Sequence, residues 1–84
     1  MDKHDIFDLI TRHAREVLPD LELHEFRYDD ALKDLGANSI DRSEIVMMTL
    51  ESLSLRVSLV EVAKAQNIGE LAEVLHEQQA KQVA

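Results

Sequence analysis

The chain has 84 residues, and its 17 Asp and Glu against 9 Lys and Arg give a net charge of −8. This length fits one domain, residues 1–84, and the negative charge disfavours nucleic acid while favouring proteins with basic patches as partners. There is no cysteine, so disulfides and cysteine-metal sites are excluded. No apolar run reaches the length of a membrane span and no signal peptide is visible. We therefore expect a cytoplasmic protein without a membrane partner, and we expect it to be a monomer.

The composition and the first apolar pattern indicate an all-α fold. Hydrophobic residues make up 45% of the chain, with one Pro and two Gly, which is typical of a small helical bundle. A first helix is predicted over residues 2–18, where apolar residues recur at helical spacing before Pro19. Residues 19–37 then form a long connection, which we expect to be held against the core by Leu21, Leu23, Phe26, Leu32 and Leu35.

The second helix is predicted over residues 39–53. At about 100 degrees per residue, one side of it carries the side chains that we expect in the core, namely Ile45, Val46, Thr49, Ser52 and Leu53. Ile40 and Met47 lie on the opposite side, which also carries the acids Asp41, Glu44 and Glu51. Scattered exposed hydrophobes are ordinary in soluble proteins. Beside a functional residue, however, this mixture of apolar and acidic groups suits docking to a basic partner.

Two capping patterns predict the remaining helices. Ser58-Leu59-Val60-Glu61 has the form of a capping box and opens a short helix through Ala65, in which we expect most apolar residues to be buried: Leu59, Val60, Val62 and Ala63. Asn67 and Glu70 give a second cap, and the helix that follows has the buried stripe Ile68, Leu71, Ala72 and Leu75. Residues 78–84 are expected to fray. The prediction is a four-helix bundle with three longer helices, one short helix and a long first loop.

One hydroxyl stands where the long connection gives way to the second helix, in the segment Leu35-Gly36-Ala37-Asn38-Ser39-Ile40-Asp41. A helix N-terminus has unpaired N–H groups and a partial positive charge, so it tolerates a phosphate. Gly36 permits a tight turn before the helix, and Asn38 or Ser39 can cap it. A simple helix cap would also explain Asn38-Ser39, so these two residues alone do not define a site.

The segment resembles the signature of acyl carrier proteins, in which Asp-Ser-Leu follows Leu-Gly, and the helix order is similar to that family over most of the chain. The resemblance implies a bundle of the acyl carrier type, with residues 1–84 as one acyl carrier domain. It implies a covalent 4'-phosphopantetheine cofactor, attached to Ser39 from coenzyme A by a phosphopantetheinyl transferase. It also implies acyl intermediates held as thioesters, with no catalytic residue in the carrier itself. The second helix is the family's recognition helix, which implies a partner-binding set of Asn38, Ile40, Asp41, Arg42, Ser43, Glu44, Met47 and Glu51.

The chain departs from the family's usual pattern at Asn38, which replaces an acid, and at Arg42 and Ser43, where fatty acid carriers tend to have a neutral residue and a valine. Arg42 places a positive charge in the acidic face, which points to a dedicated partner. We expect a discrete carrier of polyketide biosynthesis. It resembles carriers that deliver acetyl or malonyl groups to a hydroxymethylglutaryl-CoA synthase-like enzyme during β-branching. Acyltransferases and ketosynthases with basic docking patches are further expected partners.

Other interpretations of the same residues stay open. The chain fits a carrier of fatty acid synthesis, or an unmodified carrier-like module that docks through its acidic second helix. His4, His13, His24 and His76 lack the spacing of zinc ligands, so no metal site is expected. A hydrolase would need a base and an oxyanion hole beside Ser39, for which a small bundle offers little room. If an arm is attached, we expect it to visit a groove between the second and third helices, lined by Val46, Leu59 and Val62.

Overall fold

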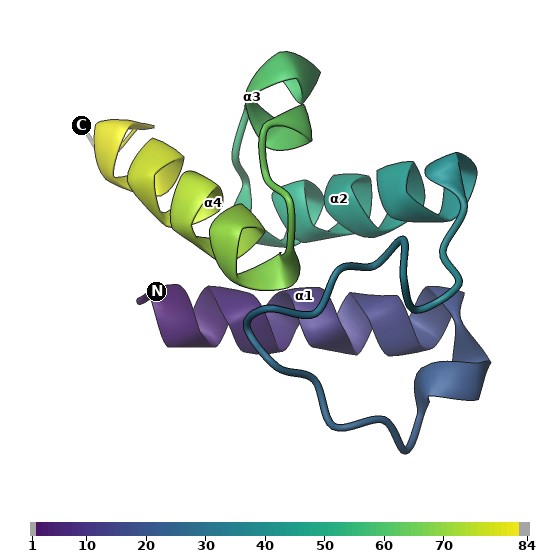
Figure 1. Ribbon diagram of the computed structural model, residues 1–84. Coiled ribbons are helices and arrows are strands. Elements are labelled where there is room, and N and C mark those ends of the chain that lie inside the picture. The colour runs from purple at the N-terminus through teal and green to yellow at the C-terminus, as the bar shows by residue number, and fades with distance from the viewer. Residues whose placement is uncertain (1, 83–84) are drawn as a thin grey trace.

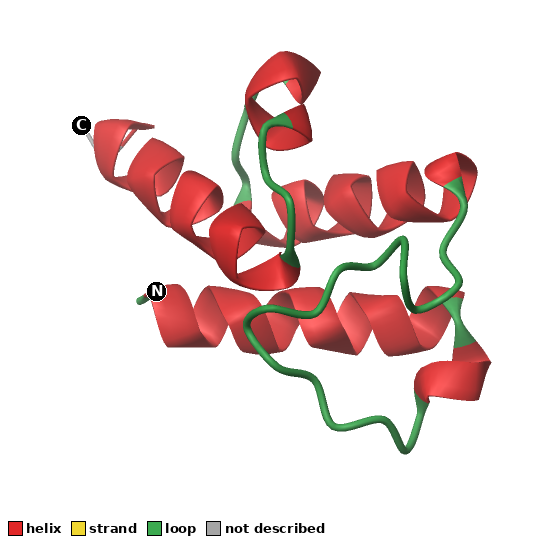
Figure 2. Ribbon diagram, in the orientation of Figure 1, coloured by secondary structure: helices red, strands yellow, loops and turns green. Residues whose placement is uncertain are grey.

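The computed structural model describes residues 2–82 and shows an all-α fold (Figure 1). Four α-helices lie within this range, joined by loops and one short 3-10 helix (Figure 2). Their bounds are α1 Lys3–Val17, η1 Pro19–Leu21, α2 Ser39–Leu53, α3 Leu59–Ala63 and α4 Ile68–Gln82. The three long helices have 15 residues each and α3 has 5. The predicted order of three longer helices, one short helix and a long first loop is confirmed.

α1 is the central element of the bundle, because it packs against both α2 and α4 (Figure 1). Asp2 caps its first turn by accepting the N–H of Asp5 at 2.8 Å. Its inner side carries Ile6, Ile10 and Ala14, all of them fully buried. Burying a side chain as large as isoleucine stabilises a fold by about 2 kcal/mol. The helical spacing of these residues therefore fixes which side of α1 faces the core.

The inner side of α2 matches its predicted core set in part. Ile45, Val46 and Thr49 are buried, and the Thr49 hydroxyl donates to the Ile45 carbonyl at 2.8 Å. Ser52 is exposed, so its predicted place in the core is wrong. It lies at the rim of the contact between α1 and α2, with its Oγ 3.0 Å from Nε2 of His13. A hydroxyl at this rim keeps its access to water, which burial would remove.

The long connection between α1 and α2 is only partly held by apolar side chains. Leu32 is buried, and Phe26 and Leu35 pack against the core in partly buried positions. Leu21 is half-buried. Leu23 is 93% exposed, so its predicted contact with the core is wrong. It lies in the turn that follows η1, where the chain reverses on the surface and has no neighbouring helix to cover it.

Polar and aromatic contacts hold the outer part of this loop. Arg15 donates from Nη2 to the His24 carbonyl at 3.0 Å, and its guanidinium lies over the Phe26 ring, 4.8 Å from the centroid. The Asp30 carboxylate accepts the backbone N–H of Arg27 at 2.9 Å and lies 3.1 Å from Nε2 of His24. The hydrogen bond from Arg27 and, after it, the one to His24 hold the pKa of Asp30 below its ordinary value of 3.8.

The same loop closes the bundle by pairing with the first turn of α4. The Asp30 carbonyl accepts the N–H of Ile68 at 2.8 Å. The Tyr28 carbonyl accepts the N–H of Gly69, also at 2.8 Å. Both donors lie in the first turn of a helix, where N–H groups have no partner inside the helix, so the loop satisfies them. A Cβ on residue 69 would lie only 2.8 Å from the Tyr28 carbonyl oxygen, and glycine alone allows this close approach.

α3 stands away from α1 and packs on α4 (Figure 1). Ser58 caps it by accepting the N–H of Val60 at 3.2 Å. Val62 is buried, whereas Leu59 and Val60 are 64% and 68% exposed and Ala63 is exposed as well. The predicted burial of these three residues is wrong, because a helix of 5 residues turns too few side chains toward the core. The helix also ends at Ala63, earlier than predicted.

α4 follows its predicted pattern at its start and departs from it at its end. Asn67 caps the first turn, where its Oδ1 accepts the N–H of Glu70 at 2.8 Å. The Gln82 side chain accepts the N–H of Arg56 at 3.2 Å and donates to the Arg56 carbonyl at 2.6 Å, so the predicted fraying is wrong up to residue 82. Residues 83–84 of that prediction lie outside the described residues. The predicted buried stripe is confirmed: Ile68, Leu71, Ala72 and Leu75.

Replacing Gly69 with alanine tests the contact between the loop and α4. The added methyl group must displace the Tyr28 carbonyl, so we expect Gly69→Ala to lower the free energy of unfolding by about 2 kcal/mol. The higher helix propensity of alanine, about 1 kcal/mol, opposes this loss without cancelling it. Urea titration followed by circular dichroism measures the change. Ser43→Ala, at an exposed position of α2, is the control, and its free energy of unfolding should lie within about 0.5 kcal/mol of wild type. Equal stability of Gly69→Ala and Ser43→Ala would contradict the predicted steric clash.

Asp30→Asn tests the polar contacts of the loop. Because the folded pKa of Asp30 lies below 3.8, its carboxylate stabilises the fold above that pH, and this contribution is lost as the pH falls through the folded pKa. We expect Asp30→Asn to lower the free energy of unfolding near neutral pH by about 1 kcal/mol. The difference from wild type should shrink below about pH 4. Thermal melts across this pH range measure it, with the exposed neighbour change Asp29→Asn as control; the same pH profile for both variants would contradict the prediction.

Candidate functional site

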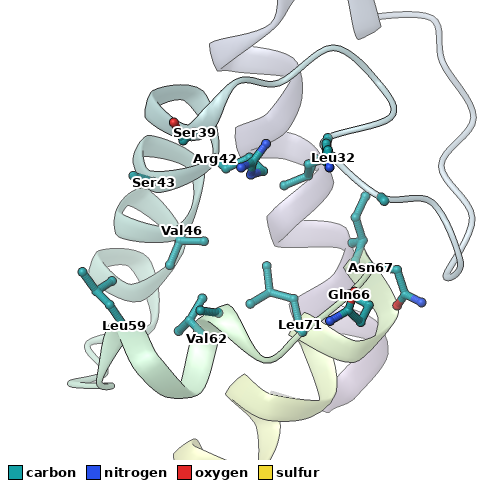
Figure 3. A pocket seen from close by; sticks show the side chains of 15 residues that line it. Leu32, Ser39, Arg42, Ser43, Val46, Leu59, Val62, Gln66, Asn67 and Leu71 are labelled. Atoms are coloured by element: carbon teal, nitrogen blue, oxygen red, sulfur yellow. The ribbon is translucent and has the colours of Figure 1, made fainter.

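Ser39 is the first residue of α2, and it is exposed. Its side chain lies at the mouth of a groove between α2 and the segments that follow it (Figure 3). The hydroxyl has no hydrogen bond to any other residue that the structure describes, so it is available to a partner molecule. The predicted position of Ser39, where coil gives way to helix and the hydroxyl faces solvent, is confirmed.

A tight turn delivers the chain to this position. The Leu32 carbonyl accepts the N–H of Ala37 at 3.0 Å, which closes the turn just before the helix. Gly36 has a φ of 99°, in the left-handed region that glycine adopts without strain. Leu32 and Ala37 are buried at the two ends of the turn. The turn is therefore anchored on both sides, and it fixes where α2 begins.

A reciprocal capping box sets the first turn of α2. Oδ1 of Asn38 accepts the N–H of Asp41 at 2.8 Å, and Oδ2 of Asp41 accepts the N–H of Asn38 at 3.3 Å. The Asn38 carbonyl accepts the N–H of Arg42 at 2.9 Å. Within residues 2–82, the N–H groups of Ser39 and Ile40 have no acceptor. The positive end of the helix is therefore open beside the Ser39 hydroxyl, which favours an anion there. An asparagine at position 38 supports this cap as well as an acid would.

The groove beside Ser39 has a volume of about 450 Å³. Val46 of α2, Val62 of α3 and Leu71 of α4 form its apolar walls (Figure 3). Leu59 lines it as well, so the predicted groove between the second and third helices is confirmed. Lys33, from the turn before α2, also lines the groove. Its contribution was not predicted, because helical periodicity says nothing about the path of a loop.

The outer side of α2 presents the predicted apolar and acidic groups to solvent. Ile40 is 76% exposed and Met47 is 63% exposed. Glu44 and Glu51 are exposed, and Asp41 is half-buried beside its capping partner. We call these five residues the outer face of α2.

Arg42 and Ser43 occupy a different side of the helix. Both line the groove rather than the outer face, so the expected positive charge within the acidic face is wrong in position. Arg42 is half-buried and donates from Nη1 to the Ala37 carbonyl at 2.9 Å, which holds its guanidinium at the mouth of the groove (Figure 3). Arg42 follows Ser39 by three positions, and residues with that spacing share one side of a helix.

Chemistry based on the histidines or on an activated serine finds no support in the described residues. His4 lies near Asp8, His13 near Glu16 and His24 near Asp30, and no group of three or more potential metal ligands gathers within residues 2–82. No described imidazole or carboxylate lies within hydrogen-bond distance of the Ser39 hydroxyl. Among the described helices, none combines the length and the apolar character that crossing a membrane requires.

Comparisons with known proteins agree with this geometry. The family described as "Phosphopantetheine attachment site" matches residues 8–75. The polyketide biosynthesis acyl-carrier-protein AcpK of Bacillus subtilis (strain 168) is 49% identical over 77 residues, which cover 92% of this chain and 94% of that protein. Among solved structures, a chain from the crystal structure of the curacin biosynthetic pathway HMG synthase in complex with acetyl donor-ACP is 42% identical. Its TM-score is 0.88, and the match covers 92% of this chain and 99% of that chain.

The chain belongs to the phosphopantetheine-bearing carrier proteins, and its fold is the four-helix bundle of the acyl carrier type. Within that family its relatives are carriers of the polyketide type, and such carriers serve enzymes by holding their acyl intermediates. The family's covalent group is 4'-phosphopantetheine. The site fits this group, because an exposed hydroxyl, free N–H groups and a groove large enough for a flexible arm lie side by side.

Proposed function

We propose that this chain, as a single carrier domain, carries 4'-phosphopantetheine on Ser39 and holds acyl groups for polyketide biosynthesis. The observation that carries the proposal is the exposed Ser39 hydroxyl at the first residue of α2, beside an open groove. The bound group supplies a terminal thiol, on which acyl groups travel as thioesters. The relatives of the polyketide type support the pathway.

Ser39 contributes only its oxygen to the attachment step. That oxygen forms the new bond to phosphorus, the bond within the diphosphate of coenzyme A breaks, and the nucleotide leaves. The hydroxyl proton needs a base, and no described side chain of the carrier is placed to accept it. We propose that a phosphopantetheinyl transferase supplies the base, so that the carrier serves this enzyme as its substrate. Free N–H groups at the start of α2 then face the phosphodiester that results.

The outer face of α2 supplies the docking surface. Its acids attract and orient a partner with a basic patch, while Ile40 and Met47 add apolar contact area. We propose a hydroxymethylglutaryl-CoA synthase-like enzyme as the principal partner, with this chain as its acetyl donor in β-branching. The solved complex of an acetyl donor carrier with HMG synthase supports this choice. Acyltransferases and ketosynthases are further proposed partners that act on the acyl group of the arm. A monomer leaves both the outer face and the groove accessible.

A mass measurement tests the attachment. We expect the full chain, incubated with coenzyme A, Mg²⁺ and a broad-specificity phosphopantetheinyl transferase, to gain the mass of one phosphopantetheinyl group. Ser39→Ala should gain nothing, while Ser52→Ala, an exposed position at the opposite end of α2, should be modified like wild type. No gain in the wild-type chain, or a gain that survives Ser39→Ala, would remove the proposal. In the first case, the unmodified docking module would take its place.

Charge reversal tests the docking surface. We expect Glu44→Lys to weaken binding of the holo-carrier to a hydroxymethylglutaryl-CoA synthase-like enzyme by about tenfold, because a basic patch then meets a like charge. Met47→Ala should weaken it several-fold through lost apolar contact. Glu25→Lys makes the same charge change in the exposed loop between η1 and α2, and it should leave binding unchanged. Isothermal titration at low salt measures the affinity of all three variants. Equal weakening by Glu44→Lys and Glu25→Lys would show an effect of net charge alone and would contradict docking through α2.

A further inference from the structure

We propose that Arg42, assisted by Lys33, binds the phosphodiester that joins the arm to Ser39 and thereby holds the arm against the groove. This inference rests on the proposed attachment at Ser39. It assigns Arg42 a positioning role toward the carrier's own prosthetic group, in addition to any contact with a partner enzyme.

The charged side chains that line the groove favour an anion there. Fifteen residues line it, and Arg42 and Lys33 are the charged ones, both of them cationic. No carboxylate of residues 2–82 lines the groove, although the whole chain has a net charge of −8. Because the charged side chains that line the groove are both cationic, the groove is a local positive region on an acidic protein. Such a region attracts an anionic group and repels none of its oxygens.

The Arg42 guanidinium is held in place and has free N–H donors. One guanidinium nitrogen is already bound to the Ala37 carbonyl at 2.9 Å, so the group is held at the mouth of the groove. A guanidinium has five N–H donors, and those not used by Ala37 are free to meet phosphate oxygens. Arg42 forms no ion pair with any carboxylate in the described part of the chain. Its charge is therefore fixed in place and unneutralised, and Arg42 and Ser39 both line this groove (Figure 3).

Lys33 has a secondary role. It lies in the turn that precedes α2, next to buried Leu32, and it lines the groove. Its side chain is exposed, so water and salt weaken its attraction for a phosphate. It acts as a point charge that adds to the field of Arg42, and it lacks the planar fork that binds two oxygens at once.

The position of these cations favours the phosphodiester over an anionic acyl group. The phosphodiester is bonded directly to Ser39, three residues before Arg42 on the same helix, whereas any carboxylate of an acyl group sits at the far end of a flexible arm. Holding the near end costs little conformational entropy, because attachment to Ser39 has already localised it. With its phosphate beside Arg42, the arm starts along the groove that Val46, Val62 and Leu71 line.

Nuclear magnetic resonance of the holo-carrier tests the contact. Mass spectrometry first verifies that wild type, Arg42→Gln, Arg42→Lys and Arg56→Gln each carry one phosphopantetheinyl group. Phosphorus spectra then follow the single phosphorus atom of the arm between about 0.01 M and 1 M salt, a range over which the Debye length falls from about 30 Å to 3 Å. We expect the wild-type signal to move with salt, and the signal of Arg42→Gln to be about twofold narrower and to move less with salt, because only Lys33 then remains.

Arg56→Gln is the matched control, because it removes the same charge from the loop beyond the opposite end of α2. It should behave as wild type, and Arg42→Lys should be intermediate. Identical phosphorus signals for wild type and Arg42→Gln would overturn the inference while leaving the attachment intact. A missing mass gain in wild type would instead overturn the proposed function.

A measurement on the wild-type chain keeps the test independent of how well any variant folds. The side-chain nitrogen resonances of Arg42 should shift when the apo-carrier is converted to the holo-carrier, and those of Arg56 should not. An unchanged Arg42 resonance would overturn the inference without any substitution.

Discussion

The site depends on one constraint, the residue at which α2 begins. The reciprocal bonds between Asn38 and Asp41 end the coil and start the helix at Ser39. A helix extended upstream by one turn would pair the N–H groups of Ser39 and Ile40 with new carbonyls and would remove the positive end from the serine. The tight turn at Gly36 prevents that extension, because the chain leaves the helical direction there. A backbone constraint thus makes an ordinary serine a suitable anchor for a charged group.

The same helix separates two kinds of electrostatic surface. Its outer face carries Glu44 and Glu51 around exposed apolar groups, and its groove side carries Arg42. One side therefore suits a basic enzyme, while the other suits the phosphate of the carrier's own arm. In the arrangement that we propose, the phosphate of the arm lies on the groove side of α2, apart from the acids of the outer face. The acidic net charge of the chain alone does not reveal this division.

The sequence predicted those features that local rules determine. Caps at Asn38, Ser58 and Asn67, together with apolar spacing, located the four α-helices of residues 2–82, but not the short helix η1. The predicted position of Ser39 agrees with the structure. The errors arose where the outcome depends on neighbours distant in sequence. Leu23 and Leu59 are apolar yet exposed, because none of the described elements covers them. The direction of a single side chain such as Arg42, and the lining supplied by a loop, follow from tertiary packing that periodicity does not encode.

Of the three helices that line the groove, α3 is the least resistant to local unfolding. Five residues with one buried side chain, Val62, provide little free energy against local opening. α2 and α4 are each three times as long and bury several residues against α1. Amide protons of α3 should accordingly exchange with solvent far sooner than those of its neighbours. We therefore expect the groove to widen at α3 for a larger acyl group, while the three long helices stay folded and keep Ser39 in position.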